Sequence, residues 1–198
     1  ETVCDSNTVR TMSLDGMGAS DQCLVRLWDP FDVSNAYFGG LMSGTIPSCI
    51  WTLPNVTLLH MSGNGFTGQL PAHLRPSCSL KDVVLTHNMI TGTMPYSFQK
   101  FPFEFLDLSY NKLKGHIDGM SNLSLSYNVS QPGATVHLEN KRLTGVLPQS
   151  YDSAYNIDIL TGNLFACDVR GRKSVVKHDP GNLNAICGSQ ELDGALST

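Results

Sequence analysis

The sequence predicts a solenoid, a single domain of stacked repeats, and three observations support that prediction. A phrase close to apolar-x-Gly-x-apolar-Pro recurs five times, centred on Gly44, Gly68, Gly92, Gly115 and Gly145. The glycines are separated by steps of 24, 24, 23 and 30 residues, and a nearly fixed period of this length is typical of stacked repeat proteins. Two apolar residues two positions apart precede the central phrases, which is the period of a strand.

The expected strands are read from these apolar pairs, and each is followed by an asparagine. The three clearest are Leu59-His60-Met61, Val83-Val84-Leu85 and Leu106-Asp107-Leu108, and the asparagines are Asn64, Asn88 and Asn111. We expect each asparagine to lie where the chain leaves a strand and turns. Its buried amide would bond backbone groups that no strand ladder satisfies.

This order of apolar pair, asparagine and glycine phrase resembles the plant-type extracellular leucine-rich repeat of receptor-kinase ectodomains and polygalacturonase-inhibiting proteins. The resemblance covers roughly residues 4 to 187. It implies a leucine-rich-repeat solenoid of short parallel β-strands, with 3-10 or irregular structure on its convex side and disulfide-capped ends. About seven repeats of 22 to 30 residues are expected, with the asparagine position at Met17, Gly40, Asn64, Asn88, Asn111, Lys141 and Asn163.

One domain is expected over residues 1–198, with three parts. Residues 1–23 would form an N-terminal cap and first repeat, 24–162 the repeats, and 163–198 a C-terminal cap and tail. The long step between Gly115 and Gly145 contains two candidate strands. We favour Val136-His137-Leu138, with residues 119–133 as an irregular excursion, because a strand at Leu123-Ser124-Leu125 would leave turns shorter than a complete repeat. That second register remains the alternative.

Composition excludes several functional classes. Only 15% of residues are charged and the formal net charge is −4, so the chain lacks the basic footprint of nucleic-acid binding. No apolar run approaches the roughly 20 residues that span a bilayer, and no signal peptide stands at Glu1. We therefore expect a mature soluble chain or an excised ectodomain.

Cysteines and glycosylation sequons favour an extracellular location. None of the six cysteines forms the Cys-x-x-Cys spacing of zinc or redox sites. Of the 15 possible connectivities we favour three pairs that each close about one repeat: Cys4 with Cys23, Cys49 with Cys78, and Cys167 with Cys187. The candidate N-glycosylation sites are Asn55, Asn122 and Asn128.

Candidate binding residues lie on the concave sheet that the resemblance implies. One outward side chain per strand would form a row across this face, because neighbouring strands lie about 4.8 Å apart. The first such row is His60, Val84, Asp107 and His137. Exposed aromatic rings, imidazoles and carboxylates suit the binding of peptide or carbohydrate, and the expected ligand-binding residues are His60, His87, Phe105, Asp107, Tyr110, His137 and Glu139.

Catalysis, a cofactor and a metal are not expected. The nucleophile-elbow, zinc-protease, phosphate-loop and dinucleotide motifs are all missing from the sequence. His60 and His137 would lie three repeats, or about 14 Å, apart, too far to share a metal ion. Asp107 and His137 are expected to be neighbours in one row. Such a pair is more often a surface hydrogen bond without a catalytic role than a catalytic dyad.

The function expected from the sequence is therefore a secreted, non-catalytic recognition domain. It would bind an extracellular protein, peptide or glycan on its concave β-face. The alternative is a structural glycoprotein subunit of an extracellular matrix, wall or filament, which would self-associate through its repeats and flanks. Ice binding, known among relatives of the inhibitor family, is disfavoured because the rows are too mixed for a regular Thr or Asn array.

Overall fold

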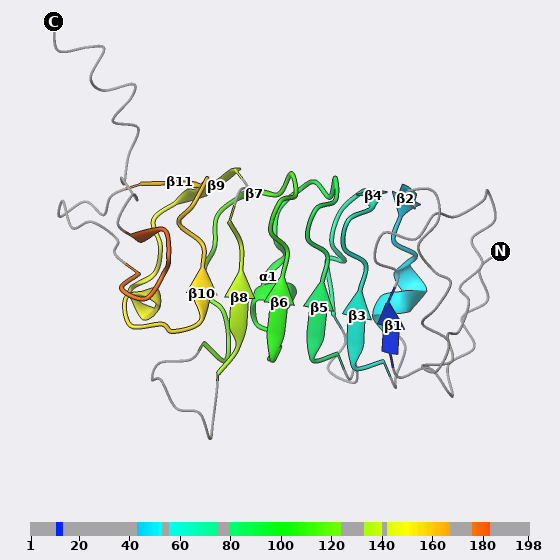
Figure 1. Cartoon of the computed structure of the whole chain (residues 1–198), viewed down its shortest axis with the longest axis horizontal. Helices are drawn as coiled ribbons and strands as arrows, with labels where there is room; N and C mark the ends of the chain where they lie inside the picture. Colours follow the sequence, from blue (N-terminus) through cyan, green and yellow to red (C-terminus); the bar gives the residue numbers. More distant parts are fainter. Residues whose placement is uncertain are drawn as a thin grey trace, which may run out of the picture.

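The computed structural model describes residues 11–13, 43–52, 56–74, 80–123, 133–139, 142–166 and 176–182. Its main sheet contains six short parallel strands in the order β1-β3-β5-β6-β8-β10 (Figure 1). Their bounds are β1 Thr11–Ser13, β3 Leu58–His60, β5 Asp82–Val84, β6 Phe105–Asp107, β8 Thr135–His137 and β10 Ile157–Asp158. The chain is thus a leucine-rich-repeat solenoid, and the predicted fold class is confirmed.

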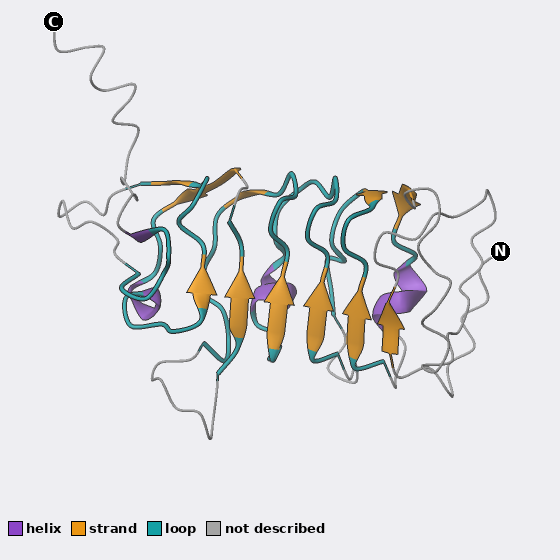
Figure 2. Cartoon of the chain, in the orientation of Figure 1, coloured by secondary structure: helices purple, strands orange, loops and turns teal. Residues whose placement is uncertain are grey.

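The repeated glycine phrase forms a second set of short strands along one flank of the solenoid (Figure 2). Strand β2 (Ser43–Thr45) pairs with β4 (Gly65–Thr67), and β9 (Arg142–Gly145) lies between β7 (Lys114–Gly115) and β11 (Leu164–Phe165). The sequence shows the period of these glycines but did not predict the pairing. Such short segments pair because the stacked repeats bring them into register.

Short helices replace strands on the side behind the main sheet. They are the 3-10 helices η1 (Ser48–Thr52) and η2 (Gln149–Tyr151) and the single-turn α1 (Tyr96–Gln99). This agrees with the convex side that the sequence predicted. Within the described ranges, no helix is long and apolar enough to cross a membrane.

The core is a continuous column of apolar side chains between the sheet and the helices. One residue from each of β3, β5, β6, β8 and β10 points inward, and the column comprises Leu59, Val83, Leu106, Val136 and Ile157, all at most 2% exposed. Aromatic rings behind the sheet extend it, with Phe98 and Phe103 at 5.0 Å between ring centroids. Each repeat therefore buries its apolar face against its neighbours, as a solenoid requires.

A ladder of buried asparagines connects successive turns, as predicted. The Asn88 amide donates to the carbonyls of Met61 (2.8 Å) and Leu85 (3.0 Å), and its oxygen accepts from the Phe66 N–H (3.0 Å). Asn111 and Asn163 bond the backbone in the same way. Each side chain thus satisfies backbone groups of its own turn and of the preceding one.

Asp179 takes the corresponding place after the last described strand. Its carboxylate accepts from the backbone N–H groups of Ile159 (2.6 Å) and Leu160 (3.0 Å), and from that of Gly181 (2.7 Å). The residue is 4% exposed. A buried carboxylate with three donors is well stabilised, because hydrogen bonds to an ionised acceptor are among the strongest in proteins.

The structure corrects the repeat count and settles the register of the long step. Strand β1, which belongs to the repeat expected at Met17, pairs directly with β3, with Thr11 opposite Leu58, so the repeat expected at Gly40 adds no strand between them. Among the described residues, the main sheet has six strands, one fewer than the seven expected repeats. Conversely β6 pairs directly with β8, which confirms Val136 as the inward residue and excludes a strand at Leu123-Ser124-Leu125 between them.

Other predictions fall partly outside the described residues. The side chains of all six cysteines lie there, as do Asn55, Asn128 and most of the excursion at 119–133. Asn122 is described: its side chain is exposed and donates to the Phe103 carbonyl at 3.2 Å. The predicted division into caps and repeats, the disulfides and the glycans therefore stay predictions.

Candidate functional site

The open face of the main sheet, the face turned away from the core, presents aligned rows of side chains. Backbone pairing places His60 beside Val84, Val84 beside Asp107, and Asp107 beside His137, as the sequence predicted, and adds Asp158 to the row. A second row runs through Leu58, Asp82, Phe105 and Thr135. All of these side chains are partly exposed.

An aromatic pair stands where two central strands end. The rings of His87 and Tyr110 are stacked, with centroids 4.2 Å apart and planes 17° from parallel. Both backbones have positive φ, 56° and 51°, and glycines, Gly63 and Gly162, occupy the same position in two other turns. The left-handed conformation is energetically costly for a bulky residue. These two turns are therefore strained, and each places an aromatic ring at the end of its strand.

Hydrogen bonds fix the polar groups beside this pair. The Asp107 carboxylate accepts from both the backbone N–H (2.9 Å) and the hydroxyl (2.6 Å) of Ser109. The Thr86 hydroxyl lies 2.7 Å from that of Ser109 and 2.9 Å from the His87 Nδ1 atom. Phe105 and His137 make a tilted ring contact at 5.7 Å. The centre of the face is therefore largely preorganised.

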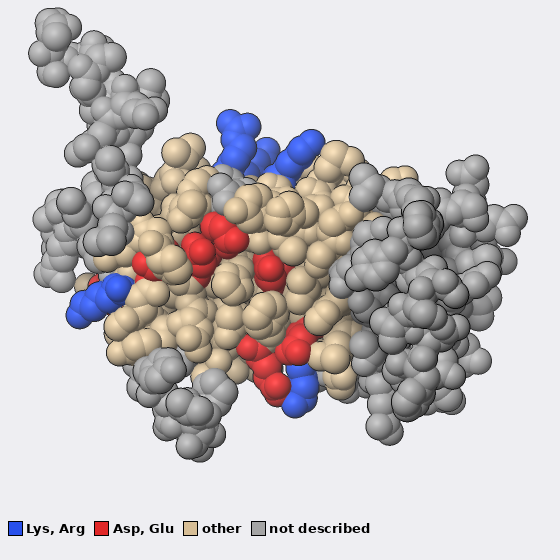
Figure 3. Space-filling model, in the orientation of Figure 1, with Lys and Arg blue, Asp and Glu red and all other residues tan. Residues whose placement is uncertain are grey.

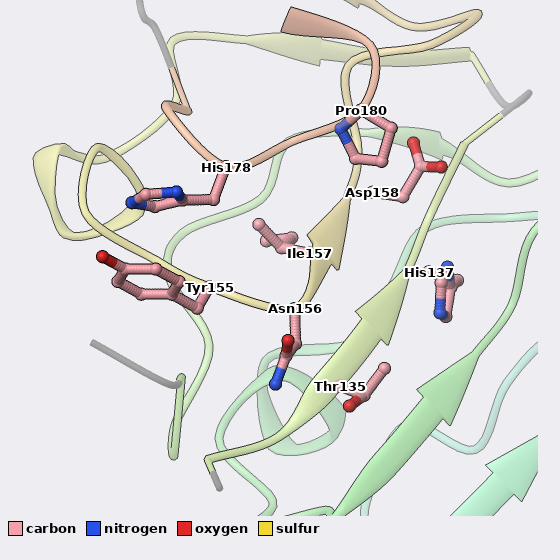
Figure 4. A pocket seen from close by; sticks show the side chains of 8 residues that line it. All are labelled: Thr135, His137, Tyr155, Asn156, Ile157, Asp158, His178 and Pro180. Carbon is pink, nitrogen blue, oxygen red and sulfur yellow. The ribbon is translucent and has the colours of Figure 1, made fainter. Parts of the chain in front are cut away.

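A hollow of about 460 Å³ lies at the end of the face nearest β10 (Figure 4). Its lining comes from β8, from the segment entering and forming β10, and from residues that fold back from the C-terminal part of the chain. Stacked rings form one wall, with Tyr155 and His178 at 3.6 Å between centroids. The full lining is Thr135, His137, Tyr155, Asn156, Ile157, Asp158, His178 and Pro180.

An imidazole and two carboxylates converge beside this hollow. Ligand atoms of His137, Glu139 and Asp158 all lie within 4.8 Å of one another. Burial, followed by the negative charges of Glu139 and Asp179, raises the pKa of Asp158 to about 6, while His137 opposes the shift and Asp107 adds to it. The three side chains are partly exposed, so the group is accessible to a ligand.

Charge is distributed unevenly over the molecule. Acidic side chains gather over the open face, whereas the described Lys and Arg lie at its margins, at the top, the left and the bottom of the view (Figure 3). Along the described strands, the outward rows include Asp82, Asp107 and Asp158 but no Lys or Arg. The basic residues Lys114 and Arg142 belong instead to the flanking strands β7 and β9. The open face is thus electrostatically suited to a basic partner.

The seven residues expected to bind ligand all lie on or at the margin of the open face, six of them in two groups and His60 apart. His87 and Tyr110 touch each other, as do Phe105 and His137. Glu139 and His137 belong to the cluster beside the hollow. His60 lies at the other end of the row, where it lowers the pKa of Asp82 against the larger opposing effects of burial and Glu104.

Sequence reasoning missed the residues around β10. Ile157 and Ile159 are two positions apart and precede Asn163, which is the pattern of the earlier strands, so Asp158 was detectable as the next member of the row. Tyr155 and His178 carry no comparable signal. They meet because the segment around residues 176–182 folds back on the last turn, with Lys177 N–H bonded to the Asp152 carbonyl.

Comparisons with known proteins agree with the geometry. The sequence model of the Leucine Rich Repeat family matches residues 55–76. Receptor-like protein 18 of Arabidopsis thaliana is 29% identical over 133 residues, which are 65% of this chain and 14% of the relative. The chain therefore spans only a small part of that relative's length.

Solved structures show the same fold. A crystal structure of a Pollen Receptor Kinase 3 matches with a TM-score of 0.51 and 25% identity, over 75% of this chain and 64% of the other. The ectodomain of the Arabidopsis receptor kinase HAESA, in complex with an IDA peptide hormone, matches with a TM-score of 0.52 and 28% identity, over 66% and 21%. The chain therefore has a leucine-rich-repeat fold, is homologous to Arabidopsis receptor-like proteins and is similar in structure to plant receptor-kinase ectodomains.

Proposed function

We propose that this chain is a non-catalytic recognition domain that binds a peptide or an extended protein segment across the open face of the main sheet. One observation carries the proposal: aligned rows of aromatic, imidazole and acidic side chains run over the parallel strands and end in the hollow beside β10. The ligand-binding residues are those predicted from the sequence, together with Asp158 and the stacked pair of Tyr155 and His178.

The physical basis is a rigid, preformed surface. The strand backbones are fixed by their ladders, and Asp107 is fixed by two bonds from Ser109. Little conformational entropy is lost when such a face binds, so more of the contact energy contributes to affinity. The rings at Phe105 and Tyr110 provide the large amphipathic contacts that recur at binding hot spots.

Charge indicates the chemistry of the ligand. The open face has carboxylates at Asp82, Asp107, Glu139 and Asp158, and its described outward rows lack a Lys or Arg to balance them. We therefore expect a ligand with at least one Lys, Arg or free amino group. HAESA, one of the structural matches, is seen with a peptide hormone, which supports a peptide as the ligand class.

We place this domain in the extracellular space. The placement is supported by homology to receptor-like proteins, by the six cysteines without metal or redox spacing, and by the three sequons. On this proposal the paired cysteines stabilise the ends of the solenoid, and glycans at Asn55, Asn122 and Asn128 cover its margins without blocking the rows.

Selection from a random peptide library displayed on phage tests the function directly. The immobilised chain should enrich peptides that contain Lys or Arg. The double variant Phe105→Ala/Tyr110→Ala should lose most of that binding. The matched control is Tyr96→Ala, because Tyr96 is an aromatic residue with 64% exposure on α1, away from the open face.

Two outcomes would contradict the proposal. Equal enrichment by the double variant and the wild-type chain would show that binding does not use the open face. Concentration-dependent self-association in sedimentation velocity, unchanged by the double variant and accompanied by no peptide enrichment, would instead support the structural-subunit alternative.

A further inference from the structure

We propose that His137, Glu139 and Asp158 form a binding site for a divalent transition-metal ion, with Zn²⁺ as the preferred ion. Three ligand atoms, one imidazole nitrogen and two carboxylate oxygens, lie within 4.8 Å of one another. The proposal does not rest on peptide recognition, although the same three residues also belong to the proposed peptide-binding face. It adds a chemistry that the sequence did not indicate, since the fold alone brings Asp158 to the other two residues.

The backbone holds the three residues in place. Asp158 is paired with His137 in the parallel ladder between β8 and β10, and the Leu138 N–H donates to the Asp158 carbonyl at 2.7 Å. Glu139 is two residues after His137, so its side chain emerges on the same side of the sheet. Two of the ligands therefore come from paired strands and the third lies just beyond the end of β8, an arrangement that favours a defined site.

Each of the two carboxylates has a buried oxygen without a hydrogen-bond partner. Glu139 Oε2 and Asp158 Oδ1 are both shielded from solvent, and neither has a hydrogen-bond partner. A carboxylate oxygen that is removed from water and left unpaired is costly. No Lys or Arg stands in the described strand rows beside them, and Asp107 and Asp179 add further negative charge nearby. A bound cation would supply the missing partner.

The ligand set indicates the kind of ion. Calcium and magnesium prefer all-oxygen coordination, whereas an imidazole nitrogen suits zinc and related transition metals. Zn²⁺ binds nitrogen and carboxylate oxygen at about 2.0–2.2 Å, so the ligand atoms must draw closer together on binding. On this proposal the partly exposed side chains rotate to bring them together. Three protein ligands leave a fourth tetrahedral position, which would face the hollow lined by Tyr155 and His178.

Isothermal titration with ZnCl₂ tests the site on the full chain. The chain is first stripped with EDTA, and any free thiols are alkylated so that the cysteines cannot bind zinc. We expect one saturable site in the wild-type chain, at least a tenfold loss of affinity in His137→Ala, Glu139→Gln and Asp158→Asn, and no comparable binding of Mg²⁺. Circular dichroism in EDTA would confirm that each variant remains folded.

Other imidazoles of the same surface provide matched controls. His60→Ala and His87→Ala remove histidines outside the cluster and should leave the zinc affinity unchanged. A second readout is cobalt: Co²⁺ should give visible absorption bands that disappear in Asp158→Asn. The proposal is overturned if the wild-type chain shows no saturable zinc binding, if Glu139→Gln and Asp158→Asn bind as tightly as the wild type, or if His60→Ala loses as much affinity as His137→Ala.

Discussion

The imidazole of His87 lies over the phenol ring of Tyr110, 4.2 Å away between centroids, although each residue holds a left-handed backbone. Stacked rings contribute about 0.5–1.5 kcal/mol beyond their area burial. A double-mutant cycle with His87→Ala and Tyr110→Ala should therefore give a coupling energy of about 0.5–1 kcal/mol, measured by urea unfolding. Additive effects of the two substitutions would show that the contact contributes no stability.

Asn111 tests the asparagine ladder. Its amide donates to the carbonyls of Leu85 and Leu108, and its oxygen accepts from the Ile90 N–H. Asn111→Ala leaves buried backbone groups unpaired, at about 1–3 kcal/mol for each lost partner, so we expect a loss of about 3 kcal/mol in the free energy of unfolding. Gln149→Ala, at an exposed amide, should change stability by less than about 0.5 kcal/mol.

Asn111→Asp separates the donor and acceptor roles of the same side chain. Aspartate retains an acceptor for the Ile90 N–H but has no donor for the two carbonyls. It should remain clearly destabilising at pH 7. Stability equal to that of the wild-type chain would show that only the acceptor matters in the ladder.

Alanine substitution at two glycines of the repeated phrase separates backbone strain from a steric clash. Gly44 and Gly145 both have positive φ, 102° and 91°. A Cβ at Gly44 would meet nothing within 4 Å, whereas one at Gly145 would overlap the His116 imidazole. Gly145→Ala should therefore lower the melting temperature more than Gly44→Ala. Adding His116→Ala to Gly145→Ala should remove this additional loss of melting temperature. If the additional loss is unchanged, the clash with His116 is not its cause.

Asp82 should make stability depend on pH in a specific direction. Burial and then the charge of Glu104 raise its pKa above the ordinary 3.8, against smaller opposing effects of His60 and Lys81. A raised folded-state pKa means that the ionised carboxylate destabilises the fold above that pKa, and that the cost disappears as pH falls below the unfolded-state value.

The corresponding variant is Asp82→Asn. It should be slightly more stable than the wild-type chain at pH 7, by less than about 1 kcal/mol because the site is largely solvated. The difference should approach zero near pH 3. Urea unfolding at the two pH values measures it, and a difference that grows on acidification would contradict the direction of the shift.

The cysteines provide a prediction outside the described residues. Peptide mapping without reduction should recover Cys4 with Cys23, Cys49 with Cys78, and Cys167 with Cys187. Each closed loop would contribute about 3 kcal/mol in the chain-entropy model. Free thiols throughout the mature chain would contradict the extracellular assignment.

The sequence was most informative where one residue type has one physical role. Alternating apolar residues such as Leu106 and Leu108 predicted the strands, and the asparagines predicted the turns, because both patterns are local. The rows of the open face followed directly from this register. His60 and Asp107 were therefore placed in one row from the sequence alone, and the structure confirms it.

Features that depend on distant segments were not predictable in the same way. The repeat expected at Gly40 was wrong as a strand of the main sheet because β1 pairs with β3 across a long intervening stretch, which no local pattern reveals. The stack of Tyr155 and His178 requires the chain to fold back after the last turn. The cluster of His137, Glu139 and Asp158 was not predicted because the row expected from the sequence ended at His137, although Ile157 and Ile159 show the period of β10.

Asp179 makes the C-terminal end of the asparagine ladder chemically different from the rest. Each ladder asparagine both gives and receives hydrogen bonds, so the opening of one turn leaves polar groups stranded in the next. Asp179 only receives: it holds the Ile159 and Leu160 N–H groups. In a nearest-neighbour description of a solenoid, the stability of each turn depends on its contacts with the adjacent turns. The turn that contains Ile159 and Leu160 therefore gains extra stability from its bonds to Asp179. Fraying from that side must break charged hydrogen bonds first, so the turn containing the hollow should be among the slower parts of the molecule to exchange its amide protons.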